Sequence, residues 1–283
     1  MASQRDIRRR IGAVRNIKQI TRAMQFVAAS KLRRAQDATL ASRPYAEKID
    51  EVLADLAAVL GDEDHPLLAK REGGRRLLVL ITSDRGLAGP LNTNTIRFAA
   101  REITEHQGDI TLVTVGRKGR EAMRRARMPI EAHFPGFGDR PTFADVLPLS
   151  RLITDDYLAG TYDRIDLIYQ HFVSTLVQRP TLDGLLPVEP SSDTAGIPGG
   201  QFIFEPNAGA VLQQLLPRYV ATRVFQAVLE GTASFFSSQM VAMKNATENA
   251  EELIEDLTLS YNKVRQANIT REMIEIATGA RAH

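Results

Sequence analysis

Residues 218–280 decide the fold and read RYVATRVFQAVLEGTASFFSSQMVAMKNATENAEELIEDLTLSYNKVRQANITREMIEIATGA. No proline follows Pro217, and the only later glycines are Gly231 and Gly279, so little here stops a helix. Apolar or small residues recur at a mean spacing of about 3.6, which is helical periodicity. They are Val220, Val224, Ala227, Gly231, Phe235, Ser238, Ala242, Ala246, Ala250, Leu253, Leu257, Tyr261, Val264 and Ala267. We predict one helix over residues 207–280, on the order of 100 Å long.

A helix of this length needs a partner, because packing rather than propensity stabilises most helices. Residues 6–59 carry a second helical pattern, which Pro44 should bend. Its first apolar side comprises Ile7, Ile11, Val14, Ile17, Ile20, Met24 and Val27. Small residues such as Ala242 and Ala246 would let the two backbones approach closely. Phe236 and Met243 lie off the first stripe, which indicates a second apolar surface that faces a larger bundle or another protein.

The middle of the chain alternates strand and helix patterns. We expect strands at 77–82, 110–115, 130–134, 165–173, 181–188 and 201–205, helices at 91–106, 118–127 and 142–158, an exposed linker at 61–76 and a mobile loop at 189–200. This alternation predicts a doubly wound sheet. The expected fold is α/β, with a doubly wound domain (75–206) inserted between the N-terminal (1–60) and C-terminal (207–283) helices of a long antiparallel coiled coil.

Composition excludes several classes of protein. The 283 residues are 43% hydrophobic and 25% charged, and no apolar run approaches the roughly 20 residues that span a bilayer. The absence of cysteine excludes disulfides and thiolate chemistry, and the five histidines lack metal-ligand spacing. Residues 1–10 are basic but lack the apolar core of a secretory signal. We expect a cytosolic or membrane-peripheral protein without a metal site.

Charge is unevenly distributed. Residues 1–48 hold twelve Lys or Arg against three Asp or Glu, whereas residues 244–283 hold five against seven. The two ends should attract each other. One alternative function is a basic coiled coil that binds nucleic acid through residues such as Arg8, Arg15 and Arg22. Apolar residues are interleaved with these charges, however, and DNA-gripping basic helices are polar all round.

A second alternative is a nucleotide-binding α/β enzyme. Ser83, Asp84, Arg85 and Gly86 follow the first strand, where open α/β sheets bind ligands. Against this, the chain lacks both G-x-G-x-x-G and G-x-x-x-x-G-K-[ST], and no Ser/His/Asp order or H-E-x-x-H is present. We expect no catalytic residues and no cofactor.

Short blocks along the whole chain resemble the gamma subunit of the rotary (F-type) ATP synthase. They are ITRAM at 20–24, VAASKL at 27–32, SRPYA at 42–46, SDRGL at 83–87, MVAMK at 240–244, YNKVRQA at 261–267, and ITRE at 269–272 with EI at 275–276 and GA at 279–280. The resemblance implies a non-catalytic rotor shaft inside a ring of alternating alpha and beta subunits. It also implies contacts with an epsilon subunit and with the membrane rotor c-ring.

The resemblance also assigns roles to single positions. Met24 and Lys31 would pass an acidic loop of beta, and Ile276 would lie in the apolar bearing of the ring. Residues implied to meet a polar catch loop are Arg265, Gln266, Thr270 and Glu272. Other implied partner contacts are Arg85 and Gln239, and the implied rotor-ring contacts are Phe202, Phe204 and Glu205.

Two positions depart from the family pattern. Gln239 stands where arginine is usual, and Ala88 stands where many members have cysteine, so thiol regulation is not expected. With no transit peptide apparent, we expect a bacterial protein that is peripheral at the cytoplasmic face of the inner membrane.

Overall fold

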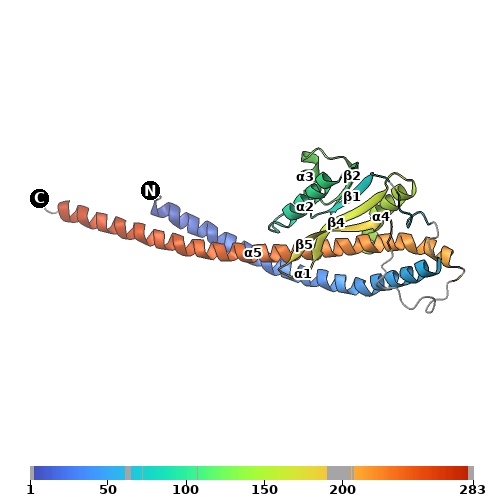
Figure 1. Cartoon of the computed structure of the whole chain (residues 1–283). Helices are drawn as coiled ribbons and strands as arrows, with labels where there is room; N and C mark the ends of the chain where they lie inside the picture. The colour runs from blue at the N-terminus through green and yellow to red at the C-terminus, as the bar shows by residue number, and fades with distance from the viewer. Residues whose placement is uncertain are drawn as a thin grey trace. The chain divides into compact units, whose positions relative to one another are not determined.

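The computed structural model describes residues 3–60, 65–71, 73–106, 108–189, 205 and 207–279. The chain forms two compact units, one of residues 1–29 with 239–283 and one of residues 30–238. Two long helices contribute to both units: α1 (Gln4–Leu60), which continues through Pro44, and α5 (Ala208–Gly279) (Figure 1). The two predicted helices are therefore confirmed, with bounds within two residues of those expected.

The larger unit contains a five-stranded sheet with the strand order β3-β2-β1-β4-β5. The strands are β1 (Arg76–Ile81), β2 (Ile110–Val115), β3 (Ile130–Phe134), β4 (Arg164–Phe172) and β5 (Gln178–Leu186). The first four are parallel, and β5 pairs antiparallel with β4. All six residues of β1 are buried, and the five after Arg76 form the Leu/Val/Ile run expected of a central strand.

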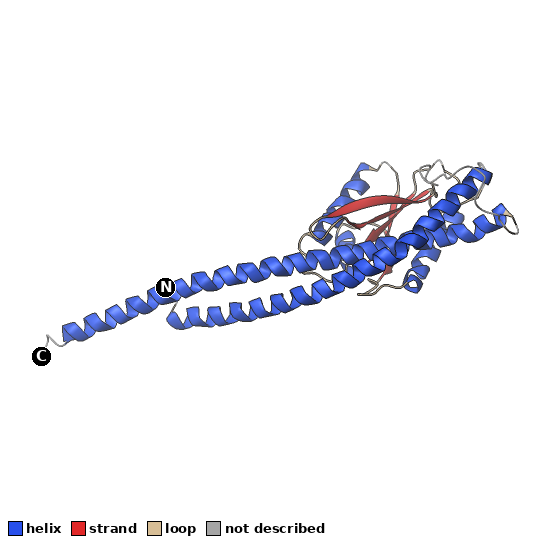
Figure 2. Cartoon of the chain, turned by 90° about the horizontal axis from the view of Figure 1, so that it is seen from below, coloured by secondary structure: helices blue, strands red, loops and turns tan. Residues whose placement is uncertain are grey.

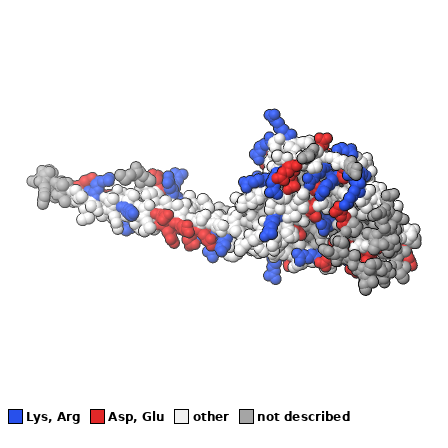
Figure 3. All heavy atoms as spheres, viewed as in Figure 1, with Lys and Arg blue, Asp and Glu red and all other residues white. Residues whose placement is uncertain are grey.

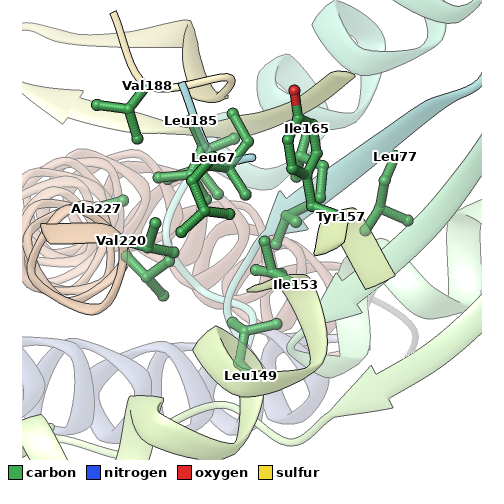
Figure 4. Packing of buried hydrophobic residues seen from close by; sticks show 14 of the residues in the cluster. Leu67, Leu77, Leu149, Ile153, Tyr157, Ile165, Leu185, Val188, Val220 and Ala227 are labelled. Atoms are coloured by element: carbon green, nitrogen blue, oxygen red, sulfur yellow. The ribbon is translucent and has the colours of Figure 1, made fainter. Parts of the chain in front are cut away.

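Helices cover both faces of this sheet. One face carries α2 (Leu91–Glu105) and α3 (Arg117–Arg125), and the other carries α4 (Phe143–Leu158) with the parts of α1 and α5 that belong to this unit (Figure 1). Because strand side chains alternate, Leu78 packs with Met123 of α3, whereas Leu77 joins the core of Leu149 and Val220 (Figure 4). The doubly wound arrangement is confirmed.

The expected linker before β1 is partly core. Leu67 is 1% exposed and packs in the main apolar cluster, and its carbonyl accepts a hydrogen bond from the Val188 N–H at 2.8 Å. Arg71 stacks over the Tyr157 ring with its guanidinium 4.3 Å from the ring centroid. The sequence did not predict this packing, because the segment has mixed charge and a single buried leucine produces no periodic pattern. The predicted strand at 201–205 and the loop at 189–200 lie almost wholly outside the described residues.

In the smaller unit, α1 and α5 run antiparallel and side by side (Figure 2). Three hydrogen bonds join them: Gln4 Nε2 to Tyr261 Oη at 3.0 Å, Lys18 Nζ to Glu251 Oε1 at 2.6 Å, and the Thr21 and Thr247 hydroxyls at 2.8 Å. Residue numbers rise along one helix as they fall along the other, which defines the antiparallel pairing. The Lys18–Glu251 contact is also an ion pair between the basic and the acidic end of the chain.

The predicted apolar stripe of α1 is only partly buried. Ile7 and Ile11 are buried, but Ile17, Ile20 and Val27 are 52%, 59% and 54% exposed. When two helices pack as a pair, each buries only a narrow strip of its surface. A row of apolar residues that winds around the helix therefore moves out of this buried strip. These three residues of the predicted apolar side are therefore left exposed in this unit.

Candidate interaction sites

The loop after β1 is held in a fixed turn by the first turn of α2. The Ser83 N–H donates to Asn92 Oδ1 at 3.2 Å, and Asn92 Nδ2 donates to Ser83 Oγ at 2.9 Å. Ser83 Oγ donates in turn to the Arg85 carbonyl at 2.7 Å. Leu87 then adopts a φ of 62° and is 61% exposed, so the loop presents an apolar side chain in a backbone conformation that L-residues rarely adopt.

The carboxylate of Asp139 binds Lys31 and Arg85, two residues that the family resemblance implies to be partner contacts. Lys31 Nζ on α1 lies 2.6 Å from Asp139 Oδ2, and a terminal nitrogen of Arg85 lies 2.8 Å from Asp139 Oδ1. Lys31 Nζ also lies 5.5 Å from the centroid of the Phe236 ring on α5. Lys31 is therefore oriented by its own chain, with a side chain only 22% exposed.

The environment of Asp139 favours its ionised form. Partial burial alone would raise the pKa of this carboxyl, but the hydrogen bond from Lys31 and the charge of Arg85 outweigh burial and lower the pKa below its ordinary value of 3.8. Asp139 was not selected from the sequence. The available signal was that β1 and β3 are parallel strands of one sheet, so Arg85 and Asp139 follow strand ends at the same edge.

Hydroxyl groups of α5 hydrogen-bond to strand β4 and to the loops that follow β1 and β4. Ser234 Oγ donates to the Gln170 carbonyl at 3.0 Å, Ser237 Oγ to the Thr175 carbonyl at 2.6 Å, and Ser238 Oγ to the Ala88 carbonyl at 2.7 Å. One helix thus satisfies carbonyl groups that the sheet leaves at its carboxyl end. Of the apolar residues that lie off the first stripe, Phe236 is 1% exposed in this unit.

The smaller unit exposes apolar side chains on both helices. On α1 they include Phe26 at 62% besides Ile17, Ile20 and Val27. Gln4 at the start of α1 pairs with Tyr261, so the later residues of α5 extend past the start of α1 (Figure 2). In this extension, Ile269, Met273 and Ile276 are 48%, 65% and 72% exposed. Contiguous exposed apolar surface of this kind indicates a partner.

The residues assigned by resemblance lie in several different settings. Met24 and Gln239 are half-buried, while Arg265, Gln266, Thr270 and Glu272 are exposed on the extension of α5 together with Ile276. Lys31 and Arg85 meet at Asp139, as described above. Glu205 is exposed, and Phe202 and Phe204 lie outside the described residues.

A basic surface lies on α3. Its basic residues are Arg117, Lys118, Arg120, Arg124 and Arg125, and Arg127 follows the helix. Lys and Arg side chains gather over this part of the larger unit in the space-filling view (Figure 3). Within the described ranges, no group of three or more His, Asp or Glu is arranged to hold a metal ion. None of the helices searched over those ranges is long and apolar enough to cross a membrane.

Comparison with known sequences gives one consistent result. A family model described as ATP synthase matches residues 3–282. An ATP synthase gamma chain of Desulfitobacterium hafniense is 49% identical over 282 residues, which cover 100% of this chain and 99% of that protein. An ATP synthase gamma chain of Dehalococcoides mccartyi is 48% identical over 287 residues with the same coverage.

Solved structures agree with the sequence comparison. The central stalk and c-ring structure of Tetrahymena thermophila mitochondrial ATP synthase contains a chain that is 25% identical, with a TM-score of 0.64 and coverage of 80% of this chain and 99% of that one. A chain from the Euglena gracilis mitochondrial ATP synthase is 20% identical, with a TM-score of 0.68. The aligned region covers 99% of this chain and 94% of the Euglena chain. The second likeness concerns the fold alone.

Proposed function

The chain belongs to the ATP synthase gamma chain family, and from this membership we propose that it is the central rotor shaft of a proton-translocating ATP synthase. The family match over residues 3–282 is the observation that carries this proposal. The nucleic-acid-binding and nucleotide-enzyme alternatives find no support in the comparisons. In this role the chain makes and breaks no covalent bond, and the catalytic sites belong to its partners.

The proposed partners follow from the assemblies in which similar chains occur. A ring of alternating alpha and beta subunits surrounds the paired helices, and the exposed apolar residues of α1 and α5 supply the contact surface. An epsilon subunit and the membrane rotor c-ring bind the larger unit, and we assign Glu205, Phe202 and Phe204 to the rotor contact. The chain is peripheral, at the cytoplasmic face of a bacterial inner membrane.

Coupling follows from differential contact. The shaft presents different side chains to each beta subunit. Each beta subunit therefore shifts between conformations with an open or a closed nucleotide site, because binding to the shaft stabilises the conformation that makes the better contacts with it. We assign the contacts to Met24, Lys31, Arg85 and Gln239, and to Arg265, Gln266, Thr270, Glu272 and Ile276 on the α5 extension. For this mechanism we divide the chain into an N-terminal shaft segment (1–60), an α/β domain (75–206) and a C-terminal shaft segment (207–283).

A charge placed at Met24 tests this assignment. If Met24 passes an acidic partner loop, Met24→Lys adds an ion pair at a partly desolvated interface, which contributes about 1 to several kcal/mol in one rotational state. A lower free energy in that one rotational state raises the barrier for leaving it and slows each turn. ATP-driven proton pumping in reconstituted membranes should therefore fall while the complex stays assembled. Gln266→Ala should partly relieve the loss, and a double-mutant cycle would record the non-additivity.

The control is Gln19→Lys, which adds the same charge at an exposed position on another side of α1. It should leave pumping near that of the parent. Equal losses for the two lysine variants, or strictly additive losses in the double variant, would contradict the assigned contact.

A further inference from the structure

A pocket of about 80 Å³ lies at the carboxyl ends of β1 and β4 in the larger unit. β1 pairs with β2 on one side and with β4 on the other. The order in which strands are added to the sheet therefore reverses direction between β1 and β4. In doubly wound sheets ligands bind outside the strand ends at this point.

The pocket has mostly apolar walls with a few polar groups. Phe137, Phe235 and Phe236 are among its aromatic residues, and the Phe235 and Phe236 rings meet edge to face at 5.4 Å. Polar lining residues include Ser83, Asn92, Thr95, Gln170 and Thr232. Apolar walls with a few fixed polar groups are typical of small-molecule sites.

Gln170 provides an unsatisfied hydrogen-bond acceptor. The Thr95 hydroxyl donates to the Leu91 carbonyl at 2.9 Å, so its oxygen is free to accept, and Gln170 Nε2 donates to it at 2.8 Å. Gln170 Nε2 also donates to the Leu91 carbonyl at 3.3 Å, which fixes the amide orientation. Gln170 Oε1 has no hydrogen-bond partner among the described residues, although the residue is only 4% exposed. A buried amide oxygen of this kind is satisfied by an N–H or O–H donor.

The charges of the pocket disfavour an anion. Arg85 is the one Lys or Arg among the described residues that line it, and that guanidinium is already paired with Asp139. Asp84, the other lining carboxylate, accepts a hydrogen bond from the Arg117 N–H at 2.8 Å. A phosphate or carboxylate would therefore meet two carboxylates and no available cation.

We propose that this pocket binds a small neutral aromatic heterocycle whose ring N–H donates to Gln170 Oε1. Such a ligand places its ring against the phenylalanine walls and supplies the donor that Gln170 lacks. Since Val228, Gly231 and Thr232 of α5 also line the pocket, the ligand would contact the sheet and the long helix together.

Indole tests the proposal directly with the full chain, which contains no tryptophan, so no tryptophan emission overlaps the fluorescence of the probe. Benzofuran is the matched probe, because an oxygen acceptor replaces the N–H in a ring system of the same size. Indole should bind about tenfold tighter than benzofuran, as one hydrogen bond to a buried acceptor predicts. The fluorescence of bound indole gives its dissociation constant, and displacement of indole by benzofuran gives the second one.

Two variants separate the acceptor from the cavity. Gln170→Met removes the acceptor and should make the two probes bind equally, whereas Gln178→Met, outside the pocket, should keep the preference for indole. Gly231→Leu should abolish binding of both probes, because a Cβ at Gly231 meets only Ile81 at 3.8 Å and the longer side chain enters the pocket. Thermal melts check that each variant is folded. Equal binding of the two probes to the parent, or undiminished binding to Gly231→Leu, would overturn the proposal even if Gln170→Met failed to fold.

Discussion

Lys31 Nζ lies 2.6 Å from Asp139 Oδ2, and this ion pair ties α1 to the loop between β3 and α4. Asp139 also binds Arg85, so one carboxylate connects a long helix with two loops at the edge of the sheet. The pairing gives Lys31 a role within the larger unit. Any partner that engages Lys31 must compete with Asp139 for it.

Asp139→Asn should lower the stability of the larger unit by about 1 kcal/mol at neutral pH, a modest value because the pair is partly exposed. The folded-state pKa of Asp139 is depressed, so its contribution is present above the ordinary value of 3.8 and is lost as pH falls through the folded pKa. Urea unfolding of both proteins should give a constant difference from pH 7 to 5 that shrinks below about pH 4. Asp37→Asn, at an exposed position on α1, is the control and should change nothing.

Asp50→Asn should instead raise the stability of the larger unit at neutral pH. Burial, together with Asp183 and Glu47, raises the pKa of Asp50 despite the opposing charge of Arg223, so the ionised form is disfavoured in the folded state. At pH 7 the neutral asparagine should stabilise the chain by a few tenths of a kcal/mol, allowing for solvent screening. The stabilisation that protonated Asp50 provides is full below 3.8 and is lost as pH rises through the folded pKa, so the gain should vanish in acid. A loss of stability at pH 7 would show that the Arg223 charge dominates.

The exposed apolar residues of α5 should matter for assembly and little for stability. Ile269→Ser removes a 48% exposed side chain beyond the helix pairing, so the unfolding midpoint of the isolated chain should stay within about 0.5 kcal/mol of the parent. Its yield of complex with co-expressed alpha and beta subunits should fall. Ile11→Ser is the contrast, because Ile11 is 8% exposed and its loss should cost about 2 kcal/mol or more. Assembly unaffected by Ile269→Ser would remove this residue from the interface.

The regular elements were predictable because their signals are local. The Leu/Val/Ile run of β1 and the long helical periodicity of α5 each identify an element without knowledge of its neighbours. Exposure along α1 was not predictable, since periodicity cannot tell whether Ile20 faces a helix of the same chain or another protein.

The internal contacts of the candidate sites were also hidden from the sequence. Asp139 follows a short edge strand, and only the strand order brings it to Lys31, which lies more than a hundred positions earlier. The same holds for Gln170 and Thr95, whose hydrogen bond joins β4 to α2. Residue type and spacing could suggest Lys31 and Arg85 as contacts, but not the carboxylate that they share.

Rotation of the chain within its assembly tests the central claim most directly. The chain has no cysteine, so Arg124→Cys on exposed α3 creates a single thiol for an optical label on the complex with alpha and beta subunits fixed to a surface. During ATP hydrolysis the label should turn repeatedly in one direction and should stop when ATP is removed. An assembly that hydrolyses ATP at full rate while the label stays still would contradict the proposal that this chain is the rotor shaft.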